Sequence, residues 1–210
     1  MLSAAMWVSV FVYWLENVNF SLDGLKVLLL PIAAMMSLLP IFFPGSLIAL
    51  AGKTAMFPWH LSVALLAYST LTIAAFHAVM MSLLDAHLHK LSGAQQHWLT
   101  AALERLPALM TMEKILFRLV SLGFVLLTLT VLSGVIFSEQ VLGVAVKWDH
   151  KTLLSLLSWA LFGILLLGRK WRGWRGKTVL SFTLGGFLTL LLAYVGSRFV
   201  LEVLLHRSLS

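Results

Sequence analysis

The sequence predicts an all-α fold, a polytopic transmembrane helical bundle with about six spans. Hydrophobic residues make up 60% of the 210 residues and charged residues only 11%, and the mean hydropathy is +0.98. A soluble globular domain is roughly half apolar and a quarter charged. A chain of this length cannot bury so much apolar surface in a core of its own, so we expect lipid to solvate it as an integral membrane protein.

Apolar segments follow one another along the chain, separated by polar connections. A helix needs about 20 residues to cross the hydrocarbon layer. The first segment is short, and it starts at Met1 without the basic residues that open a signal peptide, so we expect the chain to begin partway through a longer protein. The predicted spans are residues 1–15, 27–50, 58–84, 115–137, 152–168 and 178–205.

Prolines and polar residues mark the ends of these segments. Pro58 suits a first helical turn, where its missing N–H costs nothing. Residues 85–114 form the longest polar connection, in which residues 96–110 are predicted to be a helix lying on the bilayer surface. Residues 138–151 are predicted to be a second loop, and residues 169–177 a tight basic turn.

The distribution of lysine and arginine predicts the orientation, because cytoplasmic loops are enriched in both. If the turn at residues 169–177 is cytoplasmic, that side holds nine of these residues and the other side four. This topology places His60, the 138–151 loop and the end of the chain on the outer side, the periplasm of a bacterium. The net charge of +7 then reflects cytoplasmic loops and not a nucleic-acid partner.

His60 stands near the start of the third predicted span. An imidazole at this depth must be hydrogen-bonded, face protein or bind a ligand, and neutral imidazole is a good ligand of haem iron. The positions that share its helix face are Ala64, Ala67, Leu71 and Ala75. A face of small residues admits either another helix or a flat cofactor, and the sequence leaves both open. His77 lies on a different face, and we interpret it as structural.

Two further places carry candidate ligand contacts. Asp149 could simply cap the fifth span, or it could fix a loop in which Trp148 offers a ring face to an aromatic ligand. Arg198 and Glu202 are four residues apart and can form a pair, which leaves Arg198 as a weaker candidate for an anionic group. The 210 residues contain no cysteine, so disulfides and thiolate chemistry are excluded. No nucleophile–base–acid set is evident, and we predict that the protein is not an enzyme.

Several motifs, in order and spacing, resemble the CcsA/ResC-type cytochrome c assembly family of membrane proteins, and within it the short YpjD/HemX-like branch. The resemblance extends from about residue 7 to the end of the chain. The matching positions are residues 59–63 (WHLSV), 67–69 (AYS), 126–134 (LLTLTVLSG), Gly143, Trp148, Asp149, Lys151, Trp159 and 173–177 (GWRGK). The departures are Leu142 and Val146 where the family has loop tryptophans, His150 where it has proline, and Leu167 where it has a second histidine.

The resemblance implies a single transmembrane helical domain over residues 1–210, without some N-terminal helices of the family. It implies a multi-pass protein of the bacterial inner membrane that binds or handles haem at the periplasmic side in cytochrome c biogenesis. His60 would be the axial ligand of the haem iron, Trp148 and Asp149 would be loop contacts, and Arg198 would meet a haem propionate.

The departures support an alternative hypothesis. On that view the chain is a non-catalytic accessory or regulatory subunit that has lost the haem site and packs against a membrane-protein partner, for example a transporter.

Overall fold

The described part of the protein is helical throughout. The computed structural model describes residues 7, 10, 11, 13, 14, 30–35, 38, 56–89, 108–142 and 149–193. Four long helices account for most of them: α3 (Met56–His89), α5 (Leu109–Leu142), α6 (His150–Arg172) and α7 (Lys177–Leu191). The all-α prediction is confirmed over these ranges, which contain no strand.

Three of these helices are long and apolar enough to cross a membrane. The qualifying segments are Phe57–Ala86, Leu109–Ile136 and His150–Arg172, and Lys177–Leu191 is a shorter apolar helix. They correspond to the predicted third, fourth, fifth and sixth spans. The predicted spans 1–15 and 27–50 and the surface helix at 96–110 lie largely or wholly outside the described residues. The membrane assignment is therefore confirmed, while the total of about six spans stays a prediction.

The helices extend into the predicted connections at both ends of the bundle. Helix α5 continues to Leu142, five positions past the predicted end at residue 137, and α6 continues to Arg172, four positions past the predicted end at residue 168. Helix α3 continues to His89, so His87 and His89 lie in a helix and not in the predicted loop. Helix α5 begins at Leu109, six positions before the predicted start at residue 115. The predicted spans were ended at the first polar residues. The helices continue through these residues, because a helix keeps its internal hydrogen bonds when it passes from lipid into water.

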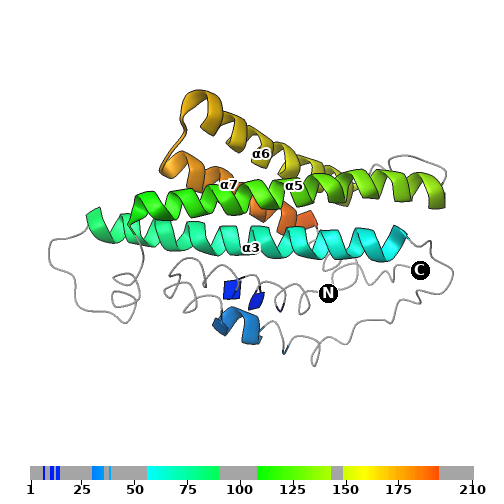
Figure 1. The fold of residues 1–210 in the computed structure, drawn as a ribbon, viewed down its shortest axis with the longest axis horizontal. Helices are drawn as coiled ribbons and strands as arrows, with labels where there is room; N and C mark the ends of the chain where they lie inside the picture. The colour runs from blue at the N-terminus through cyan, green and yellow to red at the C-terminus, as the bar shows by residue number, and fades with distance from the viewer. Residues whose placement is uncertain are drawn as a thin grey trace.

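The helices run antiparallel in sequence order. Figure 1 shows α3 and α5 side by side along their length, with the α6–α7 hairpin packed on them. The start of α3, the end of α5 and the start of α6 lie at one end of the bundle, called here the His60 end. The end of α3, the start of α5 and the α6–α7 turn lie at the other, called here the basic end. The helix ends that are predicted to share a side of the membrane thus lie at the same end.

Small residues let α3 and α5 approach closely. Ala67 and Leu71 on α3 are fully buried, and Ala64 and Ala75 nearly so. A Cβ atom added at Gly123 of α5 would lie 2.5 Å from Leu71 Cδ2, so a larger residue would force the helices apart. The face that the sequence left open to a helix or a cofactor is therefore covered by protein along these positions.

The α6–α7 hairpin is held by a tight turn and by packing across it. Gly173 ends α6 in the left-handed region at φ 64°, and its N–H donates to the carbonyls of Arg169 and Gly168. Only glycine takes up this conformation without strain. Further along, the buried Ser158 hydroxyl of α6 donates to the Gly186 carbonyl of α7 over 2.7 Å.

An ionic cluster joins the turn to the start of α5. Arg169 and Arg175 both donate to Oε1 of Glu113, whose side chain is only 9% exposed. Arg169 also donates to the Trp174 carbonyl over 3.1 Å and lies 4.6 Å from the centre of the Phe117 ring. A nearly buried carboxylate needs such partners, since an unpaired charge at this depth is costly.

Candidate functional site

His60 lies one turn into α3 and contacts α5 at the His60 end. Its imidazole is half-buried, and Nδ1 lies 2.8 Å from the Ser133 Oγ. The Ser133 hydroxyl donates its one hydrogen to the Thr130 carbonyl over 3.1 Å. In the tautomer with the proton on Nδ1, the ring N–H donates to the Ser133 oxygen. The lone pair of His60 then lies on Nε2, the state in which an imidazole can bind a metal.

Glycine completes the contact between the two helices. A Cβ atom added at Gly134 would lie 3.4 Å from Cε1 of His60, so the ring packs directly against the helix at this point. Ser133 and Gly134 are the last two residues of the motif at residues 126–134, one of those on which the family resemblance rests. His60 and Ser133 are 73 positions apart in the chain, so the pattern of either helix alone does not predict their contact.

The start of α6 reaches the same end of the bundle. Lys151 is exposed in its first turn. His150 is exposed beside it. The predicted gathering of His60, Asp149 and His150 on one side of the membrane agrees with this placement (Figure 1).

Asp149 serves as the N-cap of α6. Its Oδ1 accepts from the Thr152 backbone N–H over 2.8 Å, the simpler of the two roles considered for it. Burial raises the pKa of the Asp149 carboxyl, but the Thr152 hydrogen bonds and the charges of His150 and Lys151 outweigh this effect and bring the pKa below its ordinary value. Trp148 and Arg198, the other two candidate contacts, lie outside the described residues.

Other positions named from the sequence have defined surroundings. Nε1 of Trp159 donates to the Thr128 Oγ1 over 2.9 Å, and the indole stacks on Phe124 with ring centres 5.7 Å apart. Leu167 is 46% exposed on α6. His77 is fully buried, and its Nε2–H donates to the Met112 carbonyl over 2.9 Å, a contact that suits a structural residue.

The donor set limits what this site can hold. Within the described ranges, no group of three or more histidine, aspartate or glutamate residues could bind a metal ion. A single imidazole whose lone pair lies on Nε2 fits one axial position of a haem iron.

Comparison with known proteins places this geometry in context. The family model described as "Cytochrome C assembly protein" matches residues 1–205. "Inner membrane protein YpjD" of Escherichia coli strain K12 is 32% identical over 183 residues, which cover 84% of this chain and 65% of that protein. "Cytochrome c biogenesis protein CcsA" of Gloeobacter violaceus is 31% identical over 101 residues, or 48% of this chain and 30% of that protein.

A more distant relative agrees with these two. The "Cytochrome c biogenesis protein CcsA" of Chlamydomonas reinhardtii is 26% identical over 143 residues, which cover 68% of this chain and 38% of that protein. The chain thus spans less than two thirds of the length of each of these relatives. No solved structure matches it.

Proposed function

Because this chain belongs to the cytochrome c assembly protein family, we propose that it binds haem at the outer side of the bacterial inner membrane, in a step of cytochrome c biogenesis. The observation that carries the proposal is the hydrogen-bonded chain from Nδ1 of His60 through Ser133 to the Thr130 carbonyl. A histidine that ligates a metal usually donates its other ring N–H to a fixed acceptor. This chain supplies that acceptor from a neighbouring helix.

Each residue of the proposed site has its own task. His60 offers Nε2 to the haem iron, and Ser133 holds the ring in one tautomer and one orientation. Gly134 keeps the imidazole close to α5. Trp148 and Arg198 remain proposed contacts for the porphyrin ring and a propionate. Bound haem would supply an iron that accepts an imidazole nitrogen as a ligand.

The location follows from the same relatives. A protein 32% identical to this chain is named an inner membrane protein, and the described helices include three that can span a bilayer. We propose the inner membrane of a bacterium, with the His60 end facing the periplasm, because lysines and arginines gather at the opposite end.

Haem titration of the purified full chain in detergent tests the proposal. We expect a shift of the haem Soret band that saturates at one haem per chain and is lost in His60→Ala. Ser133→Ala should keep the band but weaken binding about 10- to 100-fold, the usual cost of removing the partner of a metal-ligating histidine. His150→Ala, at an exposed histidine of the same end, is the matched control and should bind like the unaltered chain. A Soret shift of unchanged size in His60→Ala would refute the assignment.

A second candidate function has two observations in its favour. The face below His60 is filled by helix packing at Ala67 and Leu71, and Leu167 is an exposed apolar residue on α6. These features suit a subunit that has kept the helical scaffold without the cofactor and binds a membrane-protein partner. Isolation from native membranes distinguishes the two: a partner in constant ratio with no haem absorbance favours this function, and haem without a partner favours the first.

A further inference from the structure

A groove between α3 and α7 at the basic end belongs to neither proposed function. Its volume is about 450 Å³, within the range of roughly 300–1,000 Å³ typical of small-molecule sites. It lies far along α3 from His60, between the last turns of that helix and the first two turns of α7. The residues that line it are Ser82, Asp85, Ala86, Lys177, Leu180, Ser181 and Leu184.

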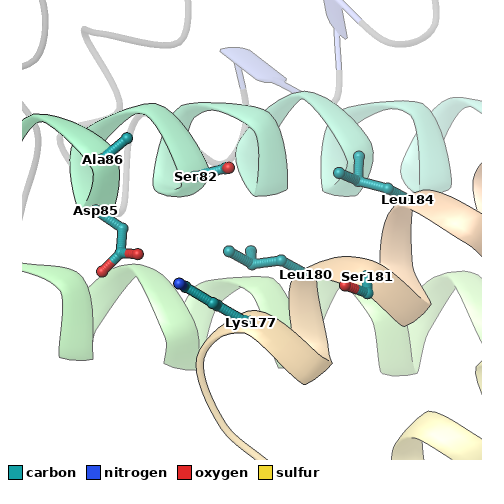
Figure 2. A pocket seen from close by; sticks show the side chains of 7 residues that line it. All are labelled: Ser82, Asp85, Ala86, Lys177, Leu180, Ser181 and Leu184. Carbon is teal, nitrogen blue, oxygen red and sulfur yellow. The ribbon is translucent and has the colours of Figure 1, made fainter.

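The groove is charged at one end and apolar at the other. Figure 2 shows the charged groups of Asp85 and Lys177 pointing toward one another at one end, with Leu184 at the far end. Lys177 is the first residue of α7, and Leu184 lies two turns further into the bundle. The polarity therefore falls from the helix ends inward, as it does across one leaflet from headgroup to acyl chain.

The charges select a particular kind of headgroup. A lysine ammonium binds phosphate oxygens as a point charge. The exposed Ser82 and Ser181 hydroxyls line the groove further from its charged end and can donate to other oxygens of a lipid. Asp85 adds a negative charge to the groove, which disfavours a headgroup that is only anionic. A carboxylate has about four acceptor positions, so Asp85 can accept from an ammonium group whatever else it contacts.

We propose that this groove binds a zwitterionic aminophospholipid of the inner leaflet, whose phosphate meets Lys177 and whose primary ammonium meets Asp85. The Ser82 and Ser181 hydroxyls contact lipid oxygens further along the groove, and Leu184 contacts the start of an acyl chain. Basic pockets between transmembrane helices on the cytoplasmic side commonly hold lipid headgroups. In this groove the Asp85 carboxylate makes binding selective for a headgroup with N–H donors.

Native mass spectrometry of the full chain in detergent tests this proposal with three lipids of identical acyl chains. We expect phosphatidylethanolamine to be retained about tenfold more tightly than phosphatidylcholine, which has no N–H donor, or phosphatidylglycerol, which has no ammonium. Asp85→Asn should remove this preference. Lys177→Gln should weaken binding of all three lipids, while Lys177→Arg should keep it.

Lys170→Gln is the matched control, because Lys170 is exposed in the same basic turn but does not line the groove. Thermal unfolding without added lipid checks that each variant is folded. Equal retention of the three lipids, or retention unaffected by Lys177→Gln, would overturn the proposal. Displacement of the lipid by millimolar inorganic phosphate or phosphoethanolamine would also overturn it, by showing that the ligand is a soluble phosphate.

Discussion

The hydroxyl groups in the membrane-spanning helices of this protein form hydrogen bonds within the protein. A polar group in hydrocarbon has no water to bind, so it must find a partner in the protein. Thr70, Thr130 and Thr183 each donate to the carbonyl four residues earlier in their own helix, over 2.8 Å. Ser133 and Ser158 instead take part in contacts between helices. The first group makes a helix tolerable in lipid, and the second fixes one helix against another.

The N-cap residue Asp149 should make the stability of the protein depend on pH. Its pKa in the folded protein lies below the ordinary value of about 3.9, so its contribution to stability is complete above that value. The contribution is lost as the pH falls through the lowered pKa. We expect Asp149→Ala to lower the free energy of unfolding by about 1 kcal/mol near neutral pH, and by less in acid.

Thermal unfolding of the full chain in detergent, between about pH 7 and pH 2, measures this difference. Asp149→Asn is the control, because asparagine is also a good N-cap and carries no titrating group. A destabilisation by Asp149→Ala that stayed constant across this range would contradict the role of the ionised carboxylate.

At the scale of helices, close packing of α6 on α7 depends on one of two neighbouring glycines. A Cβ atom added at Gly186 would lie 3.0 Å from the Phe162 ring, whereas one added at Gly185 would meet nothing within 4 Å. Phe162 is fully buried, so its ring has little room to move. We expect Gly186→Ala to lower the free energy of unfolding by about 1–3 kcal/mol.

Gly185→Ala is the matched control, and it should be neutral or slightly stabilising because alanine favours a helix. Unfolding in mixed detergent and sodium dodecyl sulfate compares the two variants. The double variant Phe162→Leu with Gly186→Ala should recover part of the loss, since it reduces the volume that the new methyl group meets. Equal effects of the two alanine variants would argue against this account of the packing.

Across the whole molecule, the two ends of the bundle differ in charge. Six described lysines and arginines stand at the basic end, and Lys151 stands at the His60 end. The six are Lys114, Arg169, Lys170, Arg172, Arg175 and Lys177; Arg118 lies within the α5 span and is not counted. Positive residues are retained on the cytoplasmic side during insertion. This asymmetry predicts that the His60 end faces the periplasm.

The absence of cysteine from the sequence makes the orientation simple to measure. We expect His150→Cys to react in intact cells with a maleimide that cannot cross the inner membrane, and Lys170→Cys to react only after the membrane is opened. Both positions are exposed, so access to the reagent decides the outcome. The reverse labelling pattern would invert the topology and would move the proposed haem site to the cytoplasm.

The sequence by itself determined that this is a helical membrane protein, roughly where four of its helices lie, and which family it belongs to. Those properties depend on local composition and on motifs, which can be recognised without contacts. It also located His60 and predicted that the start of α6 shares its end of the bundle, because alternate connections of antiparallel spans fall on the same side.

Only the tertiary structure decided how these residues are used. The partnership of His60 with Ser133 joins two helices far apart in the chain, and periodicity in one helix carries no information about a residue on another. The helix face of Ala67 and Leu71 is a second example. From the sequence it could contact a helix or a cofactor, and in the structure Gly123 of α5 packs against Leu71. The sequence shows that a small-residue face allows close approach, but only the arrangement of the helices shows what approaches it.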